Sequence, residues 1–579
     1  MGNSRPVGAL VRLPRRCAAS CTLSSRVASD DVEGLMRRAT TYEGSCEEDV
    51  QLFSLRGFSR ANFVAREMRE RRELVENYQI EEEIGAGATA KVHRAISKRT
   101  GQRVAVKAVS KSLLPNHAML RNEIAIHKAT DHPHILRLLE TYEDEENFYL
   151  VAEICDGGTL GTFMRAVGSE FGPLQMEETM ALNLLQQAVA SVRYLHKMGI
   201  VHRDLKPCNF LCFPGSSSGS QPLIKLSDFG VSGRFHMKHR LTMRVGTDGF
   251  MAPEVAMCRP YNEKADVFSL GCLLHTLLTS NPPRLLEDGT CKLSTLRLRY
   301  TSEEVRELIQ WLTQANPDDR PSVEEVARHP LLQMSEHPLG EASLGLETGG
   351  LLDRMYAYGT FPLLKKAALV AMVSRVESDL DFRPCTAKFM SFGAGRAVND
   401  VVSVEDIYQA LLSELSSNME HNLLAAMRVS STKARLPRGR GRLRAGGVAS
   451  ARFREQLRED VEQLVRQIDC DQSGTLSFSA WLAATVGPDW YAEPRRIAAV
   501  FKLFDHDRDG MIGHEDLKKV LPAVCAGIDV DAVMQESQLS TKRTTWISEE
   551  HFSLLLRTNN RSSFTLQRAA NGVEDSLTV

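Results

Sequence analysis

The sequence predicts an α+β domain followed by an all-α domain, and the evidence for the two domains comes from different halves of the chain. In the first half, short strand-like segments such as Val104–Lys107 alternate with longer helical ones. In the second half, helical segments flank two loops, Asp469–Ala480 and Asp505–Asp516, in which acidic or hydroxyl side chains occupy the first, third and fifth positions. A chain of 579 residues is also too long to fold around one core, so several domains are expected.

The composition is that of a globular protein, with 43% hydrophobic and 25% charged residues. The formal net charge of −2 gives no bulk attraction to polyanions, so we expect no specific nucleic-acid partner. The 12 cysteines show no zinc-ligand spacing, which indicates reduced thiols and a cytoplasmic protein. No apolar run reaches the roughly 18 residues that a membrane-spanning helix needs, and we expect Val267–Leu278 to be a buried helix.

Shifts in composition divide the chain into five expected segments. The first is rich in Arg and Ser, a glycine-containing linker follows residue 332, and an acid-free, arginine-rich run interrupts the second half. That run is expected to be a solvated loop. The expected bounds are 1–77 for a flexible N-terminal extension, 78–332 for the α+β domain, 333–385 for a linker with a helix, 386–557 for the all-α domain with the basic insert at about 428–454, and 558–579 for a polar tail.

The N-terminal extension has three open interpretations. It begins like an N-myristoylation signal at Gly2, although Pro6 stands where Ser or Thr is preferred. Together with Cys17 and Cys21 as palmitoylation sites, this signal would give membrane association by acylation. The Arg- and Ser-rich composition is also typical of a transit peptide. The third interpretation is an untargeted flexible tail.

A glycine-rich turn, Ile84–Val92, lies between two strand-like segments. Glycines allow such a turn to close over phosphate groups and to present backbone N–H donors to them. The third glycine of this pattern is replaced by Ala90, which is small enough to fit. The next strand ends at Lys107, and Glu123 on the following helix has the spacing of its ion-pair partner.

A second block, His202–Asn209, contains residue types suited to phosphoryl transfer. Asp204 would accept the proton of a hydroxyl nucleophile, Lys206 would neutralise charge on the transferred group, and Asn209 would hold one Mg²⁺ ion. Farther along, Asp228 would supply the main carboxylate for Mg²⁺. Phosphoryl transfer depends on positioning and cations more than on covalent chemistry, so these groups are a sufficient set.

In this order the motifs resemble those of eukaryotic protein kinases, and the Lys206-Pro207 dipeptide resembles the Ser/Thr branch of that family. The resemblance implies a bilobal protein kinase fold, ATP and Mg²⁺ as cofactors, and protein substrates. It also implies that Thr247 faces the substrate hydroxyl. The nucleotide-binding residues that it implies are Ile84, Gly85, Gly87, Val92, Lys107, Glu123 and, at the hinge, Glu153.

Three positions depart from the kinase pattern. Ala152 stands where most of these kinases carry a larger side chain, so we expect a wider apolar pocket behind the adenine. Thr159 and Cys208 stand where basophilic relatives carry glutamates that pair with a substrate arginine. We therefore expect weak preference for arginine three residues before the phosphoacceptor. A pseudokinase scaffold is an open alternative, against which the intact Lys107 and Asp228 argue.

A basic-amphipathic helix is predicted from about Leu363 to Val376. Leu364 and Ala368 fall at helical spacing, and the pair Lys365 and Lys366 lies beside them. Such a helix is typical of a calmodulin target or an autoinhibitory segment. An amphipathic surface helix without a regulatory role is the alternative.

The 505–516 loop matches the EF-hand calcium loop, which needs oxygen ligands at positions 1, 3, 5, 7, 9 and 12 and glycine at position 6. Gly510 stands at the bend. The final ligand is aspartate where glutamate is usual, and its shorter side chain lowers the expected Ca²⁺ affinity. The expected ligands are Asp505, Asp507, Asp509, the carbonyl oxygen of Met511 and Asp516.

The 469–480 loop is complete at its front but has Ala480 at position 12, so we expect weak or absent Ca²⁺ binding. Two further loops, ending at Val401–Asp406 and Trp546–His551, keep only their ends and are expected not to bind metal. The candidate ligands of the 469–480 loop are Asp469, Asp471, Ser473 and Thr475.

A kinase-like domain, a basic helix and four such loops in two pairs resemble the calcium-dependent protein kinases of plants and apicomplexan parasites, over nearly all of residues 78–557. The resemblance implies a calmodulin-like EF-hand domain that contacts the junction helix within the same chain and relieves its inhibition of the kinase when Ca²⁺ binds. The degenerate loops leave an alternative open, in which the EF-hand domain docks without responding to calcium.

Overall fold

The computed structural model describes residues 69–558, except 88, 115–116, 171–175, 214–221, 236–240, 287–289, 294–297, 299–300, 334–347, 375–381, 393–400, 418–450, 470–472, 525–529 and 538–545. The predicted acylation signals at Gly2, Cys17 and Cys21 lie outside the described residues, as does most of the basic insert. Among the described helices, none combines the length and apolar character needed to cross a membrane.

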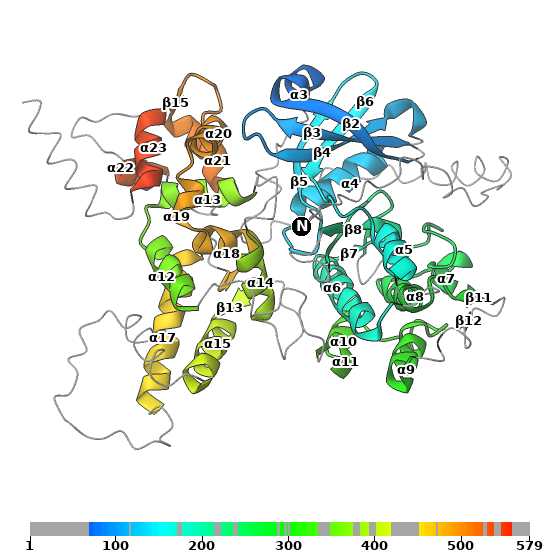
Figure 1. Cartoon of the computed structure of the whole chain (residues 1–579). Coiled ribbons are helices and arrows are strands. Elements are labelled where there is room, and N and C mark those ends of the chain that lie inside the picture. Colours follow the sequence, from blue (N-terminus) through cyan, green and yellow to red (C-terminus); the bar gives the residue numbers. More distant parts are fainter. Residues whose placement is uncertain are drawn as a thin grey trace, which may run out of the picture. The chain divides into compact units, whose positions relative to one another are not determined.

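A six-stranded sheet with the order β1-β5-β6-β4-β3-β2 forms the first part of the fold (Figure 1). Adjacent strands of this sheet pair antiparallel, except β1 and β5, which pair parallel. Val104, Val106 and Val151 face the sheet core and are buried, as the alternation of apolar residues predicts. The elements are β1 (Arg69–Glu70), α3 (Arg71–Asn77), β2 (Tyr78–Ala86), β3 (Ala90–Ser97), β4 (Arg103–Ser110), α4 (His117–Ala129), β5 (Leu138–Glu143) and β6 (Asn147–Glu153).

The N-terminal extension, predicted to be flexible up to residue 77, ends in regular structure. Strand β1 pairs with β5, and α3 places Leu74 in the same core as Tyr78. The Tyr78 hydroxyl donates a 2.9 Å hydrogen bond to the buried carboxylate of Glu140. Leu74 and Val75 are the only apolar residues of this charged segment, so the periodicity of the sequence did not indicate this helix.

Helices dominate the rest of the kinase-like part. Helix α8 is buried from Ala265 to Thr279, which confirms the prediction for Val267–Leu278. It packs against α6 and α9 around one apolar core. The helices are α5 (Leu160–Glu170), α6 (Glu178–Lys197), α7 (Pro253–Ala256), α8 (Lys264–Thr279), α9 (Glu303–Leu312), α10 (Val323–Ala327) and α11 (Pro330–Gln333). The short strands are β7 (Ile200–Val201), β8 (Phe210–Phe213), β9 (Leu223–Leu226), β10 (Gly233–Arg234), β11 (Arg284–Leu285) and β12 (Cys291–Lys292).

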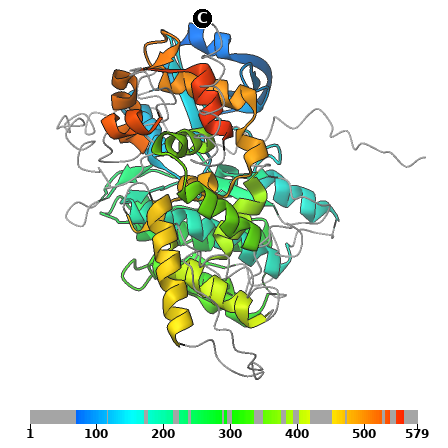
Figure 2. The same cartoon turned by 90° about the vertical axis from the view of Figure 1, so that its left-hand side faces the viewer.

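The described residues of 348–558, here called the C-terminal helical domain, share one apolar core. Figures 1 and 2 show α15 and α17 packed side by side. The helices are α12 (Thr348–Gly359), α13 (Leu363–Ser374), α14 (Arg383–Ser391), α15 (Val404–Ser417), α17 (Ala451–Ile468), α18 (Phe478–Thr485), α19 (Pro488–Tyr491), α20 (Pro494–Phe504), α21 (His514–Val524), α22 (Val530–Ser537) and α23 (Glu549–Arg557). The strands are β13 (Val402–Ser403), β14 (Thr475–Leu476), β15 (Met511–Ile512) and β16 (Ile547–Ser548).

The short strands join the predicted loops in two pairs. Strand β14 of the 469–480 loop pairs with β13, and β15 of the 505–516 loop pairs with β16. Each loop with a nearly complete ligand set is therefore joined to one of the two loops that keep only their ends. Helix α17 begins at Ala451, so the basic insert ends a few residues earlier than the predicted position 454.

The predicted amphipathic helix is α13, but the prediction that it has an exposed basic face is wrong. Every residue from Leu364 to Ser374 is buried, including Lys365 and Lys366. The helix lies in the centre of the C-terminal helical domain, against α18, α20, α21 and α22. An exposed basic face is therefore absent from this described helix.

Candidate functional site

The candidate catalytic loop, between β7 and β8, is anchored by a carboxylate from α8. The backbone N–H groups of His202 and Arg203 each donate a 2.8 Å hydrogen bond to Asp266, whose side chain is fully buried. Burial alone would raise the pKa of Asp266, but the hydrogen bond from His196 and the nearby charges hold it below its usual value. Arg203 adopts a left-handed conformation with φ of 68°, a strained geometry that concentrates at functional sites.

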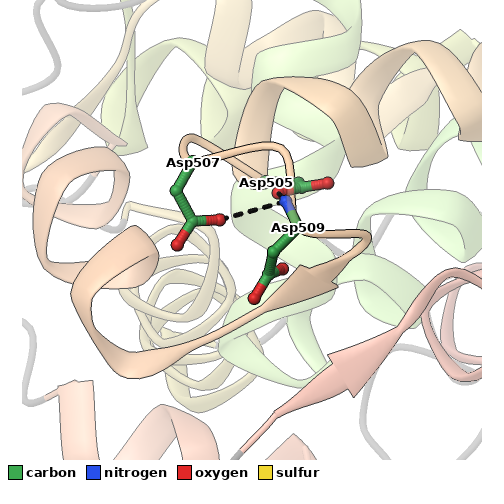
Figure 3. A group of neighbouring side chains, drawn as sticks. All are labelled: Asp505, Asp507 and Asp509. Carbon is green, nitrogen blue, oxygen red and sulfur yellow. Dashed lines mark hydrogen bonds between the residues drawn. The ribbon is translucent and has the colours of Figure 1, made fainter.

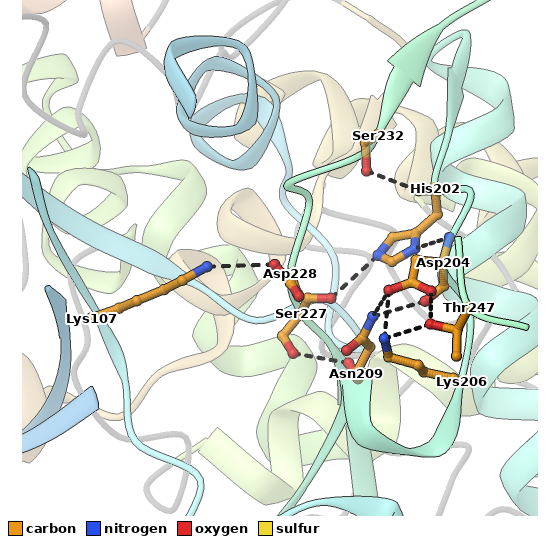
Figure 4. Close-up of polar contacts among 9 residues, drawn as sticks. All are labelled: Lys107, His202, Asp204, Lys206, Asn209, Ser227, Asp228, Ser232 and Thr247. Atoms are coloured by element: carbon orange, nitrogen blue, oxygen red, sulfur yellow. Dashed lines mark hydrogen bonds and ion pairs between the residues drawn. The ribbon is translucent and has the colours of Figure 1, made fainter. Parts of the chain in front are cut away.

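Asp204 lies at the centre of a closed polar network (Figure 4). Its Oδ2 accepts hydrogen bonds from Lys206 Nζ at 2.7 Å and from Asn209 Nδ2 at 3.1 Å. Its Oδ1 accepts one from the hydroxyl of Thr247 at 2.6 Å, and the same hydroxyl accepts from Lys206 Nζ at 2.7 Å. The three predicted residues of this loop therefore converge, and Thr247 fixes the orientation of the carboxylate.

Thr247 reaches Asp204 because the preceding residue is glycine. Gly246 has a φ of 118°, and a Cβ atom there would lie 2.6 Å from the carbonyl oxygen of Arg203. A side chain at this position would displace the segment that carries Thr247. The close approach of the two backbones thus depends on glycine.

The second cluster joins Lys107 of the sheet to Asp228, the first residue of the sequence Asp228-Phe229-Gly230. Lys107 Nζ lies 3.1 Å from Glu123 Oε1 and 3.4 Å from Asp228 Oδ1, so the predicted Lys107–Glu123 pair is present. Burial would lower the pKa of Lys107, but these two carboxylates raise it above its usual value. Likewise, burial would raise the pKa of Asp228, whereas Lys107 lowers it. Both groups are therefore charged at neutral pH.

These residues fit a magnesium nucleotide. The Asp228 side chain is about half exposed (49%), so its oxygens are accessible to a cation. The amide nitrogen of Asn209 donates to the Asp204 carbonyl oxygen at 2.8 Å, which leaves the amide oxygen pointing elsewhere as a metal ligand. Carboxylate and amide oxygens together with phosphate oxygens are the ligands that Mg²⁺ takes in such sites.

The glycine-rich turn joins β2 and β3 as predicted. Gly85 lies opposite Val92 in the hairpin, and the N–H of Gly87 donates to the carbonyl of Ala90 at 2.7 Å. Val92 in turn lies opposite Lys107 on β4, and Ile84 on β2 is exposed. The turn thus ends the hairpin whose second strand, β3, pairs with the strand that carries the lysine, while Ala88 at its tip lies outside the described residues.

Glu153, predicted at the hinge, ends β6 but directs its side chain elsewhere. Its two carboxylate oxygens accept hydrogen bonds from Lys225 Nζ at 2.8 and 2.9 Å, and both side chains are buried. Its Oε1 also accepts from the N–H of Arg137 at 2.7 Å. The Glu153 side chain therefore links the end of β6 to Lys225 on β9 and to the backbone of Arg137, and these contacts stabilise the hinge. Sequence reasoning missed Lys225, although a lysine inside the apolar strand Leu223–Leu226 is a signal that a buried counter-ion exists.

The positions that depart from the kinase pattern lie near this site. Ala152 pairs with Ala105 on β4 and with Leu138 on β5 and is 8% exposed, so one of its two strand partners is also a small residue. Thr159 stands at the start of α5, where its hydroxyl accepts a hydrogen bond from the N–H of Thr162 at 3.2 Å. Cys208 is exposed beside it, since a Cβ on Gly161 would lie 3.7 Å from the Thr159 hydroxyl and 3.8 Å from the Cys208 sulfur.

In the 505–516 loop, the carboxylates of Asp505, Asp507 and Asp509 converge, with one oxygen of each within 4.8 Å of the others (Figure 3). Gly510 has a φ of 86°, which gives the sharp bend. Asp516 lies apart from this group and accepts hydrogen bonds from the N–H groups of His506 at 3.0 Å and Gly513 at 2.8 Å. The three converging carboxylates fit a Ca²⁺ ion, which prefers several oxygen ligands.

The 469–480 loop has the same local hydrogen bonds. Asp469 accepts from the N–H groups of Ser473 at 3.2 Å and Gly474 at 2.6 Å, as Asp505 does from Asp509 and Gly510. The Ser473 hydroxyl donates to the carbonyl oxygen of Thr475 at 2.9 Å. Asp471 lies outside the described residues. The described part of the loop therefore keeps the hydrogen bonds of the 505–516 loop, while Ala480 brings no side-chain oxygen to position 12.

Comparisons with known proteins agree with this geometry. Residues 78–332 match the family described as protein kinase domain. The chain is 26% identical over 462 residues to calcium-dependent protein kinase 5 of Plasmodium falciparum, covering 78% of this chain and 72% of the relative. It is 28% identical over 453 residues to calcium-dependent protein kinase 3 of Plasmodium yoelii yoelii, covering 76% and 74%. Serine/threonine-protein kinase PLK4 of Aedes aegypti is 33% identical over 269 residues, covering 45% and 34%.

Proposed function

The chain is a serine/threonine protein kinase similar in sequence to the calcium-dependent protein kinases, and we propose that Ca²⁺ bound at the 505–516 loop regulates its activity. The observation that carries the proposal is the convergence of three carboxylates, Asp505, Asp507 and Asp509, in a loop with a left-handed glycine at its bend. We further propose that the C-terminal helical domain is a calmodulin-like EF-hand domain, since its loops are joined in pairs by short strands.

In the proposed reaction, bound Mg²⁺ and ATP supply the phosphoryl group and its neutralising charge. Asp204 orients the substrate hydroxyl and accepts its proton, while Lys206 approaches the transferred group. Lys107, fixed by Glu123, binds phosphate oxygens, and Asn209 and Asp228 would hold the metal. Ile84, Gly85, Gly87 and Val92 would cover the nucleotide, and the hinge at Glu153 would bind its base through the backbone.

The catalytic proposal is tested by Asp204→Asn. This variant should lose about 10²–10⁴-fold in kcat on a Ser/Thr peptide, because the amide cannot accept the proton. Thermal unfolding of the same variant shows whether the fold is kept. A well-folded Asp204→Asn chain that phosphorylates the peptide at the parent's rate would contradict the assignment.

The calcium proposal is tested with the calcium chelator EGTA at constant Mg²⁺. The parent should change its kinase activity between Ca²⁺ and EGTA, and Asp505→Ala should abolish this response. Asp469→Ala is the matched control, because the two aspartates make the same hydrogen bonds within their loops. Equal activity of the parent in Ca²⁺ and EGTA would instead favour a docking domain that does not respond to calcium.

A further inference from the structure

The segment Thr130–Arg137 of the kinase domain connects α4 to β5 and contacts the C-terminal helical domain through two charged side chains, Asp131 and Arg137. The described residues of both domains belong to one compact unit. Arg137 is 4% exposed, and the backbone N–H of Asp131 donates a 2.9 Å hydrogen bond to the hydroxyl of Tyr194 on α6. The kinase domain therefore holds the segment in place by contacts of its own.

Asp131 caps the first turn of α18. One of its carboxylate oxygens accepts a hydrogen bond from the backbone N–H of Ser479 at 3.0 Å, and the other accepts one from the Ser479 hydroxyl at 2.8 Å. The first N–H groups of a helix have no partner within the helix and carry partial positive charge, so a carboxylate is favourable there. The N-cap residue Ser477 accepts a hydrogen bond from the N–H of Ala480. The capping of α18 is thus shared between its own domain and the kinase domain.

Arg137 contacts a helix end of the opposite polarity. Its guanidinium group donates a 3.1 Å hydrogen bond to the carbonyl oxygen of Val373, in the last turn of α13. The last carbonyl groups of a helix lack donors within the helix and carry partial negative charge, so a cation is favourable there. The guanidinium carbon also lies 5.6 Å from the ring centre of Phe478, the first residue of α18. One kinase segment therefore provides an acid for a helix start and a base for a helix end.

These two helix ends carry no matching charges of their own. Helix α13 has no basic residue in its last turn, and α18 has no acidic residue in its first turn. By contrast, α21 after the 505–516 loop has Glu515 and Asp516 in its first turn. The 469–480 loop has Ala480 where the 505–516 loop has Asp516. The carboxylate at the start of α18 therefore comes from the kinase domain and not from the loop itself.

We propose that Thr130–Arg137 is the surface on which the kinase domain binds the C-terminal helical domain, and that the incomplete 469–480 loop with its helix α18 is the element that docks there. Asp131 takes the place of the acidic residue that this loop lacks at the start of its helix, so the contact needs no metal ion in the 469–480 loop. The inference goes beyond calcium binding at the 505–516 loop and does not depend on it.

Hydrogen exchange of the full chain, followed by mass spectrometry in the presence of Ca²⁺, tests the surface from both sides. Asp131→Ala should accelerate exchange about tenfold or more in the first turn of α18, and Arg137→Met should do so in the last turn of α13, because each variant removes a charged hydrogen-bond partner. From the other side, Ser479→Ala should accelerate exchange in the segment 130–137 about threefold or more. Such reciprocal effects are expected only of residues in contact.

Two controls remove similar groups elsewhere. Ser548→Ala removes the hydroxyl that caps α23 in the same C-terminal helical domain, and Asp318→Ala removes an exposed carboxylate of the kinase domain. Both should leave the exchange of the segment 130–137, α13 and α18 at the parent's rates. Effects of Asp131→Ala and Arg137→Met that stay within the kinase domain, together with an effect of Ser479→Ala that stays within the C-terminal helical domain, would overturn the inference.

Two features of the design keep the outcome decisive. If Asp131→Ala does not fold, Asp131→Asn keeps the shape of the side chain and removes its charge, and Ser479→Ala tests the same contact without changing the kinase domain. The inference and the proposed function also fail separately. Equal kinase activity of the parent in Ca²⁺ and EGTA, combined with reciprocal exchange effects, contradicts calcium regulation and supports the docking surface. A clear calcium response without reciprocal effects overturns the docking surface and leaves calcium regulation standing.

Discussion

Lys225→Met should destabilise the kinase domain more than any substitution of an exposed lysine. Lys225 and Glu153 are 1% and 0% exposed, and the two oxygens of Glu153 lie 2.8 and 2.9 Å from Lys225 Nζ. Removing the ammonium group leaves a buried carboxylate without that counter-ion, which costs about 3–5 kcal/mol. For a domain of this size, 1 kcal/mol corresponds to about 2–4 °C in Tm, so the expected fall is roughly 6–20 °C.

The assay is thermal unfolding of the full chain, in which the kinase transition is identified by its shift with Mg²⁺ and ATP. The Glu153→Leu, Lys225→Met double variant removes both charges and should recover most of the lost stability, because buried ion pairs add little over apolar residues. Lys91→Met breaks an exposed pair with Glu83 and should cost about 1 kcal/mol at most. A Lys225→Met chain that unfolds within about 2 °C of the parent would refute the reasoning.

Three further outcomes are expected. Ala152→Met should weaken ATP-competitive inhibitors with bulky substituents at least about tenfold by filling the space behind the adenine, and unchanged inhibition constants would show that this space is not used. Cys208→Glu should raise kcat/KM about tenfold for peptides with arginine three residues before the phosphoacceptor, whereas a peptide array on which the parent already demands that arginine would contradict the assignment. Burial lowers the pKa of Lys365 to about 7 from its usual 10.5, beside Tyr491, whose pKa burial raises to about 12. Between pH 7 and pH 10.5 the unfolded chain binds a proton at Lys365 that the folded chain does not bind. The stabilising effect of a neutral Lys365 is therefore fully present above pH 10.5 and is lost as the pH falls through 7. Lys365→Met should flatten the dependence of the domain's unfolding free energy on pH in this range.

The kinase site could be predicted from the sequence because phosphoryl transfer requires particular residue types at particular intervals. Lys107 and Glu123 meet as expected, and so do Asp204, Lys206 and Asn209. Their chemistry leaves few alternatives, and each motif occupies a short segment. The role of Thr247 as a bridge between the acid and the lysine was not predicted, because it depends on how closely two distant backbones approach.

The arrangement of buried lysines could not be predicted in the same way. Lys365 and Lys366 follow the spacing of a basic helical face. Their burial is favourable only because their Nζ atoms donate hydrogen bonds to the backbone carbonyl oxygens of Gly359, Gln467 and Thr558. Those three carbonyls are brought together by tertiary packing. Helix α12 was not expected either, since its glycines resemble a linker and its partners, α17 and α18, lie more than 90 residues later.

The strand pairing between β15 and β16 has a consequence for how the protein would read a calcium signal. Its β16 side follows Ser540, Lys542 and Thr544, which replace the acidic ligands, and β13 likewise follows a segment, Gly393–Arg396, without acids. Two filled sites on one ribbon can reinforce each other, but a filled site beside a ligand-poor one cannot. Occupancy would then rise hyperbolically with the free calcium concentration, so the response of the protein would be graded and would have no sharp threshold.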